Sequence, residues 1–186
     1  MPHKKSEYLS DGLKGSIFTS NSHSISHSRL KAKILDGKGL ALTIRNEIKE
    51  EVSLYREKGH RPPHLVAIIV GDNPASHTYV QGKMRACNHV GFASSSQHLP
   101  ASTTEEQLLE FVDKFNRDPS IDGIIVLMPL PDHITPQNVT ERIFPDKDAD
   151  GFHPRNVGLM TLNFPCMMPA TPSGILELLD RNDIHT

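Results

Sequence analysis

Residues 65–70 read LVAIIV, an unbroken run of apolar and mostly β-branched side chains. A strand with one face in water alternates apolar and polar residues, so an unbroken run predicts a strand that is buried on both faces. Such strands are typical of parallel sheets covered by helices on both sides. The stretch IDGIIVLMPL at 121–130 predicts a second strand of this kind. The two runs therefore favour folds with a parallel, doubly covered sheet.

Segments with helical periodicity come before, between and after these two runs in the sequence. Apolar residues recur at helical spacing over 38–58 and again over 75–90. Thr103 precedes Glu106 by three residues, which predicts the capping box of a third helix. A short helix is expected over 135–144. Helices thus alternate with the predicted strands along the chain.

The remaining elements complete this alternation. Residues 93–99 are a weaker strand candidate, and Thr171 with Pro172 predicts the N-cap and first turn of a helix that runs to about Arg181. We therefore predict an α/β fold, a three-layer domain with a mostly parallel sheet. Ligands of such folds bind beyond the carboxyl ends of the strands. This rule selects three stretches: GDNPASHTYVQGK, MPLPDH and the acidic turn PDKDADGFHP.

Composition excludes several classes of partner and site. The formal net charge is −2 with acidic and basic residues interleaved, and no apolar run could span a bilayer, so neither a nucleic-acid nor a membrane partner is expected. Two cysteines, Cys87 and Cys166, indicate a reducing compartment. Residues 1–33 are rich in Ser and His and are predicted to form a disordered leader or a transit segment. His23 and His27 are interpreted as part of this polar tract and not as metal ligands.

The acidic turn contains aspartates spaced two apart and then a glycine, as calcium loops do. Counted from Asp146, the position that needs a bidentate carboxylate is Val157, and Pro154 interrupts the second half. No second loop of this kind occurs in the sequence. We therefore predict no metal site, which leaves a solvated acidic turn or another role for the carboxylates.

Tyr79 and Lys83 lie four residues apart on the predicted helix 75–90, so their side chains share one face. A lysine beside an apolar wall can exchange protons near neutral pH, and a tyrosine supplies a flat ring and a hydroxyl. The same pair serves short-chain dehydrogenases, but their G-x-G-x-x-G loop is absent from this sequence. Taken alone, the spacing fits a surface lysine beside a half-buried tyrosine better than a reactive pair.

Five segments, in this order and at these spacings, resemble the methylenetetrahydrofolate dehydrogenase/cyclohydrolase family: ILDGK, VGDNPASHTYVQGKMRAC, DGIIVLMPLP, PDKDADGFHPRNVG and PATPSGILELL. The resemblance implies NAD- or NADP-dependent oxidation of 5,10-methylenetetrahydrofolate to 5,10-methenyltetrahydrofolate and its hydrolysis to 10-formyltetrahydrofolate. PASHTYV and MMPATPSG are most similar to the animal mitochondrial, NAD-using branch. That branch implies a mitochondrial location, with the cytoplasm as the alternative, and allows for Mg²⁺ in the full-length mitochondrial type.

The same resemblance assigns roles to residues. Lys83 and Tyr79 would be catalytic, with Lys83 serving the proton chemistry of the cyclohydrolase step and Tyr79 stacking along the aromatic rings of the folate. Asp150 would bind the pterin end, which makes the acidic turn a substrate clamp. The resemblance implies further substrate-binding positions at Val80, Gln81, Gly82, Val126, Leu127 and Met128.

One departure from the family pattern concerns the cyclohydrolase step. The family motif reads V-Q-L-P-L-P, whereas this sequence has Leu127 and Met128 in place of its Gln and Leu. The family's Gln holds the lysine through a hydrogen bond, and a leucine cannot replace it. We therefore expect weakened cyclohydrolase activity.

A second departure concerns the cofactor. Family members continue into a Rossmann domain with a G-R-S-x-x-V-G motif, whereas this chain stops at Thr186. We therefore expect residues 34–165 to form the folate-binding catalytic domain and residues 166–186 a helix leading to the absent domain. No cofactor-binding residues, no dehydrogenase activity of this chain alone and no homodimer without the full-length chain are expected. The alternative is a non-catalytic folate-binding or dimer-capping short isoform.

Overall fold

Three parallel strands form the sheet of this computed structural model, which describes residues 32–184. The strands are β1 (His64–Val70), β2 (Ala93–Leu99) and β3 (Gly123–Val126), in the order β2-β1-β3. The whole of β1 pairs with β2, and its residues 65–68 pair with β3. The predicted α/β fold with a parallel sheet is confirmed. Most of the predicted leader, including His23 and His27, lies outside the described residues.

The second apolar run forms a shorter strand than the sequence predicts. β3 ends at Val126, and Leu127 adds one more bond by donating its N–H to the carbonyl of Ile68 at 2.9 Å. Pro129 has no N–H with which to continue the ladder, so the remaining apolar residues leave the sheet. The end of the run therefore becomes a loop at the carboxyl edge of the sheet.

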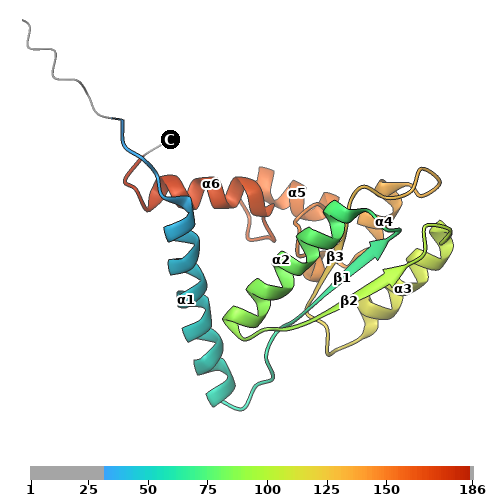
Figure 1. The fold of residues 1–186 in the computed structure, drawn as a ribbon, viewed down its shortest axis with the longest axis horizontal. Helices are drawn as coiled ribbons and strands as arrows, with labels where there is room; N and C mark the ends of the chain where they lie inside the picture. The colour runs from blue at the N-terminus through green and yellow to red at the C-terminus, as the bar shows by residue number, and fades with distance from the viewer. Residues whose placement is uncertain (1–31, 185–186) are drawn as a thin grey trace, which may run out of the picture. The chain divides into compact units, whose positions relative to one another are not determined.

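Both faces of β1 are buried, as its sequence predicts. One face packs against α3 (Glu105–Arg117) and α4 (Pro136–Arg142), and the other packs against α2 (Pro74–Val90) (Figure 1). Alternate residues of β1 join the two resulting clusters, Val66, Ile68 and Val70 in the first and Ala67 and Ile69 in the second. The sheet is thus the middle layer of three.

The other helices are α1 (Gly37–Glu57), the short 3₁₀-helix η1 (Pro145–Lys147), α5 (Pro154–Thr161) and α6 (Ala170–Asp180). Helix α1 runs beside α2, where buried Val52 lies against Gly91 at the end of α2. Within residues 32–184, no helix is both long enough and apolar enough to cross a membrane.

Three helix starts differ from the predictions. The capping box of α3 is formed by Thr104 and Gln107, one residue later than predicted, since the stretch TTEEQ offers two pairs with the right spacing. Thr171 is not an N-cap, because α6 already begins at Ala170. A proline is tolerated within a first turn, so Pro172 does not mark the start. Helix α5 was not predicted, and Pro154, taken as an interruption, is its first residue.

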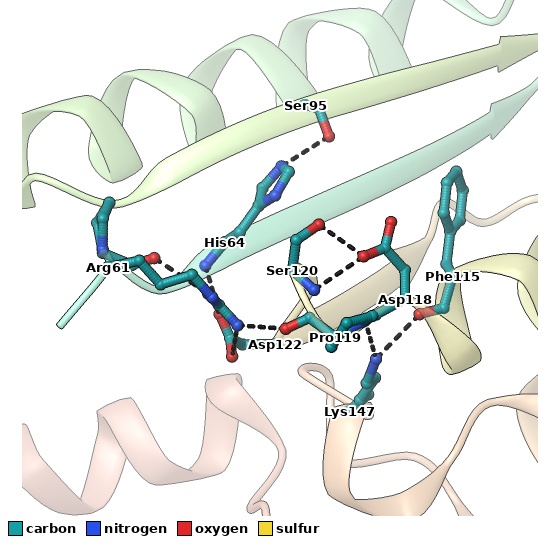
Figure 2. A network of polar contacts seen from close by, with 10 residues as sticks. Arg61, His64, Ser95, Phe115, Asp118, Pro119, Ser120, Asp122 and Lys147 are labelled. Atoms are coloured by element: carbon teal, nitrogen blue, oxygen red, sulfur yellow. Dashed lines mark hydrogen bonds and ion pairs between the residues drawn. The ribbon is translucent and has the colours of Figure 1, made fainter.

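A polar network joins the amino-terminal ends of β1 and β3 (Figure 2). The Arg61 guanidinium donates to both carboxylate oxygens of Asp122, at 2.6 and 2.9 Å, and to the carbonyl of Pro119 at 2.6 Å. Asp122 also accepts from the backbone N–H of His64 at 2.8 Å. The bond from Arg61 is the main reason that the pKa of Asp122 is lowered. The pair therefore fastens two strand ends to each other.

Lys147 extends this network to the acidic turn. Its ammonium donates to the carbonyls of Phe115 and Asp118, at 3.0 and 2.7 Å (Figure 2). These carbonyls lie at the end of α3, where a cation interacts favourably with the helix dipole. The start of the acidic turn is thereby fixed to the far side of the sheet from α2.

We expect Asp122→Asn to lower the melting temperature at pH 7 by about 2–4 °C. Because the folded-state pKa of Asp122 is lowered, its stabilising effect is complete above the usual value of 3.8 and is lost as the pH falls through the lower folded value. The gap between wild type and variant should therefore close below pH 3.8. Thermal unfolding followed by circular dichroism tests this, with exposed Asp132→Asn as control. Equal melting temperatures of wild type and Asp122→Asn at pH 7 would contradict it.

Candidate functional site

A cavity of about 380 Å³ lies where the chain leaves the carboxyl ends of β1 and β3. We call it the α2–β3 cavity. Helix α2 supplies one wall and the loop after β3 another, and the acidic turn closes a third side. Its lining residues are Ala75, Ser76, Tyr79, Val126, Leu127, Met128, Pro129, Asp150 and Phe152. The cavity is therefore at the edge of the sheet that the fold class predicts for a ligand.

Two segments far apart in sequence meet at this cavity through an ion pair. The Lys83 ammonium donates to Asp150 Oδ1 at 3.0 Å, and the two side chains are 21% and 22% exposed. The same ammonium lies 4.9 Å from the centre of the Tyr79 ring. The structure thus brings together the three residues to which the sequence assigned chemistry. Lys83 is paired with a carboxylate and does not lie against a purely apolar wall.

The three residues between Tyr79 and Lys83 point elsewhere. Val80 is buried against the sheet, in the cluster with Ala67 and Ile69. Gln81 lines a separate groove between α2 and β2, and Gly82 has open space where a side chain would be. Of this run, only the first and last residues, one helical turn apart, face Asp150.

The three residues at the end of β3 all line the α2–β3 cavity. Val126 and Leu127 are also core residues, at 6% exposure each, whereas Met128 is 40% exposed. Leu127 packs in the same cluster as Val80. An aliphatic side chain accepts no hydrogen bond, so the side chain of Leu127 cannot orient the Lys83 ammonium in this way.

The three aspartates of the acidic turn point in different directions. Asp146 is 91% exposed and lies 4.0 Å from Arg155, Asp148 is only 2% exposed, and Asp150 faces Lys83. No group of three or more His, Cys, Asp or Glu side chains in the part of the chain that the structure describes could hold a metal ion. The expectation of Mg²⁺ therefore gains no support from these residues.

Gly151 sets the path of the acidic turn. Its φ is 70°, a left-handed conformation that side chains other than glycine's disfavour. A Cβ at this position would lie 2.6–2.8 Å from backbone atoms of residues 167–169. The segment before α6 therefore packs directly on the turn that carries Asp150.

The turn after β1 does not fit a pyrophosphate. The turn after β1 contains one glycine, Gly71, and the carboxylate of Asp72 follows it. At the start of α2 the side chain of Asn73 accepts the N–H of Ala75 at 2.9 Å, and Pro74 has no N–H to offer. A pyrophosphate needs free backbone N–H groups at such a helix start.

Cys87 lies one turn beyond Lys83 on α2 but is not placed as a nucleophile. Burial is the largest influence on its thiol and raises the pKa, while the charge of Lys83 acts in the opposite direction. A thiol with a raised pKa is largely protonated at neutral pH and reacts slowly. Cys87 is therefore not a candidate for the chemistry of the site, and Lys83, Tyr79 and Asp150 stay the candidates.

Sequence reasoning did not single out several cavity residues, although they lie in the three stretches that it selected. Ser76 lies three residues before Tyr79 on the same face of α2, and this helical spacing was the signal that pointed to it. Phe152 and Pro129 have no such signal, since they reach the cavity only through the paths of their loops. Phe152 is 55% exposed and adds an aromatic surface opposite α2.

Comparison with known proteins gives one consistent answer. Residues 35–150 match the family model of the tetrahydrofolate dehydrogenase/cyclohydrolase catalytic domain. The bifunctional protein FolD of Cytophaga hutchinsonii is 51% identical over 154 residues, which are 83% of this chain and 53% of that protein.

Solved structures agree. A 5,10-methylenetetrahydrofolate dehydrogenase from the silkworm Bombyx mori is similar with a TM-score of 0.81 and 43% identity, over 82% of this chain and 53% of its own. The methylenetetrahydrofolate dehydrogenase-cyclohydrolase of Trypanosoma brucei, solved with NADP and an inhibitor, has a TM-score of 0.77 and 38% identity, over 82% and 52% of the two chains. This chain spans about half the length of these relatives.

We expect Gly151→Ala to destabilise the protein by about 1–2 kcal/mol from the backbone conformation alone, and by more if residues 167–169 must shift. The matched control is Gly158→Ala in α5, where a Cβ meets nothing within 4 Å. In a helix, alanine is more favourable than glycine, so the control should be neutral or stabilising. Urea unfolding of both variants measures the difference, and equal stabilities would contradict the packing described.

Proposed function

Because the chain belongs to the tetrahydrofolate dehydrogenase/cyclohydrolase family, we propose that its α2–β3 cavity binds the folate substrate of that enzyme. The observation that carries the proposal is that Tyr79 and Asp150 line one cavity and that the Lys83 ammonium contacts both of these side chains. These side chains come from two segments about 70 residues apart, as the 67-residue separation of the ion pair shows. An elongated substrate with a flat, hydrogen-bonding end and an aromatic middle suits this arrangement.

Each of the three side chains has a distinct role in the proposal. Asp150 accepts hydrogen bonds from the N–H groups of the pterin, a charge-assisted contact that fixes the orientation of the ring. Tyr79, which is 56% exposed, offers its ring face to the aromatic part of the folate. Lys83 contacts both side chains, and its proposed role is to donate or accept a proton at a folate nitrogen.

The reactions proposed for the complete enzyme are those of the family. They are the NAD- or NADP-dependent oxidation of 5,10-methylenetetrahydrofolate and the hydrolysis of the methenyl product to 10-formyltetrahydrofolate. The turn after β1 offers no pyrophosphate site, and the contribution proposed for the described residues is to bind and orient the folate and to move protons. A dehydrogenase would need a nicotinamide held within contact distance of the same cavity.

The hydrolytic step is proposed to be weak. Lys83 has Asp150 as its hydrogen-bond partner, and Leu127 provides no second partner that would orient the ammonium. Proton transfer depends on such positioning. The alternative, a non-catalytic folate-binding or dimer-capping form, would keep the cavity and bind folate without turnover.

We also propose a cellular location and an oligomeric state. A mitochondrial location rests on the similarity of PASHTYV and MMPATPSG to the animal mitochondrial branch, and the cytoplasm is its alternative. Homodimer formation is proposed only for a chain that carries the cofactor domain.

Binding of 5-formyltetrahydrofolate, measured by isothermal titration calorimetry, tests the folate site. We expect Asp150→Asn to raise the Kd at least tenfold, because a charge-assisted hydrogen bond contributes about 1.5–3 kcal/mol. Asp146→Asn is the matched control, since this aspartate belongs to the same turn but is 91% exposed. The control should change the Kd less than twofold. A wild type that does not bind, or an Asp150→Asn variant that binds equally well, refutes the proposal.

Hydrolysis of 5,10-methenyltetrahydrofolate, followed by its absorbance, tests the role of position 127. We expect Leu127→Gln to raise the rate at least about tenfold by supplying a hydrogen-bond partner for Lys83. Leu127→Met keeps the position apolar and should leave the rate unchanged. The comparison is made in this chain and in one joined to a cofactor domain. Equal rates of wild type and Leu127→Gln in both would show that Leu127 does not limit the step.

A further inference from the structure

Asp148 is the one aspartate of the acidic turn that faces inward. Its carboxylate accepts three hydrogen bonds: Oδ1 from the N–H of Gly151 at 3.1 Å, and Oδ2 from the N–H of His153 at 2.8 Å and from Asn156 Nδ2 at 3.0 Å. The residue is 2% exposed. Burying a carboxylate is costly unless its oxygens are hydrogen-bonded, and these three donors offset that cost.

Asn156 connects the acidic turn to α5. It lies in the first turn of α5, is 4% exposed, and its Nδ2 also donates to the carbonyl of Pro145 at 2.9 Å. One amide group thus links the beginning of the turn, the Asp148 carboxylate and α5. No buried side-chain nitrogen or oxygen within residues 32–184 lacks a partner, so this network is complete.

The sheet holds the backbone of the two residues before Asp150. Residue Asp148 forms a parallel bridge with Ile124 of β3, and the N–H of Ala149 donates to the carbonyl of Ile124 at 3.3 Å. Downstream, the N–H groups of Gly151 and His153 are held by the Asp148 carboxylate. The backbone of Asp150 is therefore anchored on both sides, and its side chain is left free to reach Lys83.

We propose that Asp148, supported by Asn156, is a positioning residue that holds Asp150 at the folate cavity. The proposal rests on the folate-binding function proposed above. Asp146, which has no neighbouring N–H bonded to the Asp148 carboxylate, is 91% exposed and its cationic neighbour lies 4.0 Å away. Asp150, four residues later, is 22% exposed and bonded to Lys83 at 3.0 Å. The inner carboxylate accounts for this difference.

The first test is Asp148→Asn. An amide has one acceptor oxygen and an NH₂ group that would face backbone donors, so the variant cannot keep all three bonds. The matched control is Asp118→Asn, because Asp118 also accepts a backbone N–H within a turn, from Ser120 at 2.8 Å, but lies outside the cavity lining. Asn156→Ala is a milder second variant, which leaves both backbone bonds to Asp148 in place.

Two measurements decide the outcome. ¹⁵N relaxation should show the order parameters of residues 149–152 falling from about 0.85 toward about 0.6 in Asp148→Asn, and partway in Asn156→Ala. Calorimetry with 5-formyltetrahydrofolate should show a Kd raised about tenfold in Asp148→Asn, within the range of coupling between neighbouring residues. In the Asp150→Asn background, Asp148→Asn should raise the Kd by less than a further twofold. Asp118→Asn should alter neither measurement.

The proposal is overturned if the order parameters of both variants match those of the wild type. It is also overturned if Asp148→Asn raises the Kd by the same factor in the Asp150→Asn background as in the wild type. Asp148 would then act independently of Asp150. A wild type that binds no folate defeats the proposed function, and the order parameters still decide whether Asp148 positions Asp150. If Asp148→Asn does not fold, Asn156→Ala supplies both measurements.

Discussion

The burial of β1 on both faces is the constraint on which the other elements depend. A strand without a polar face must be covered by helices on either side, and here α2 covers one face while α3 and α4 cover the other. Because the three strands run parallel, each connection leaves the sheet at its carboxyl edge and enters it again at its amino edge. The turns that follow the strands therefore gather at one edge, and the α2–β3 cavity forms there.

The sequence predicts the elements whose residue pattern fits only one kind of structure. It misses features that depend on contacts with residues far away in the sequence. LVAIIV has no polar face to expose, and Tyr79 and Lys83 share a face of any helix that contains both. The capping box of α3 could not be placed from the sequence, because TTEEQ offers two pairs with the same spacing and only the second forms the box. Asp148 could not be told from Asp146 or Asp150 in a stretch of evenly spaced aspartates. Its burial follows from the bridge to β3, which no local pattern encodes.

The candidate site combines a rigid helix with a turn held by side chains. Tyr79 and Lys83 are fixed by α2, whose sheet-facing side is buried through Val80. Asp150 is carried by a turn that relies on Lys147 at one end and on Asn156 at the other. The ion pair between Lys83 and Asp150 thus connects two parts of the fold that are stabilised in different ways.

The close approach at Gly151 has a mechanical consequence. Backbone atoms of residues 167–169 lie next to the position that a Cβ of residue 151 would take, so the two segments touch backbone to backbone. A displacement of residues 167–169 toward Gly151 would therefore push directly on the backbone of the turn that carries Asp150. The path of the segment before α6 thus constrains the position of the carboxylate that faces Lys83.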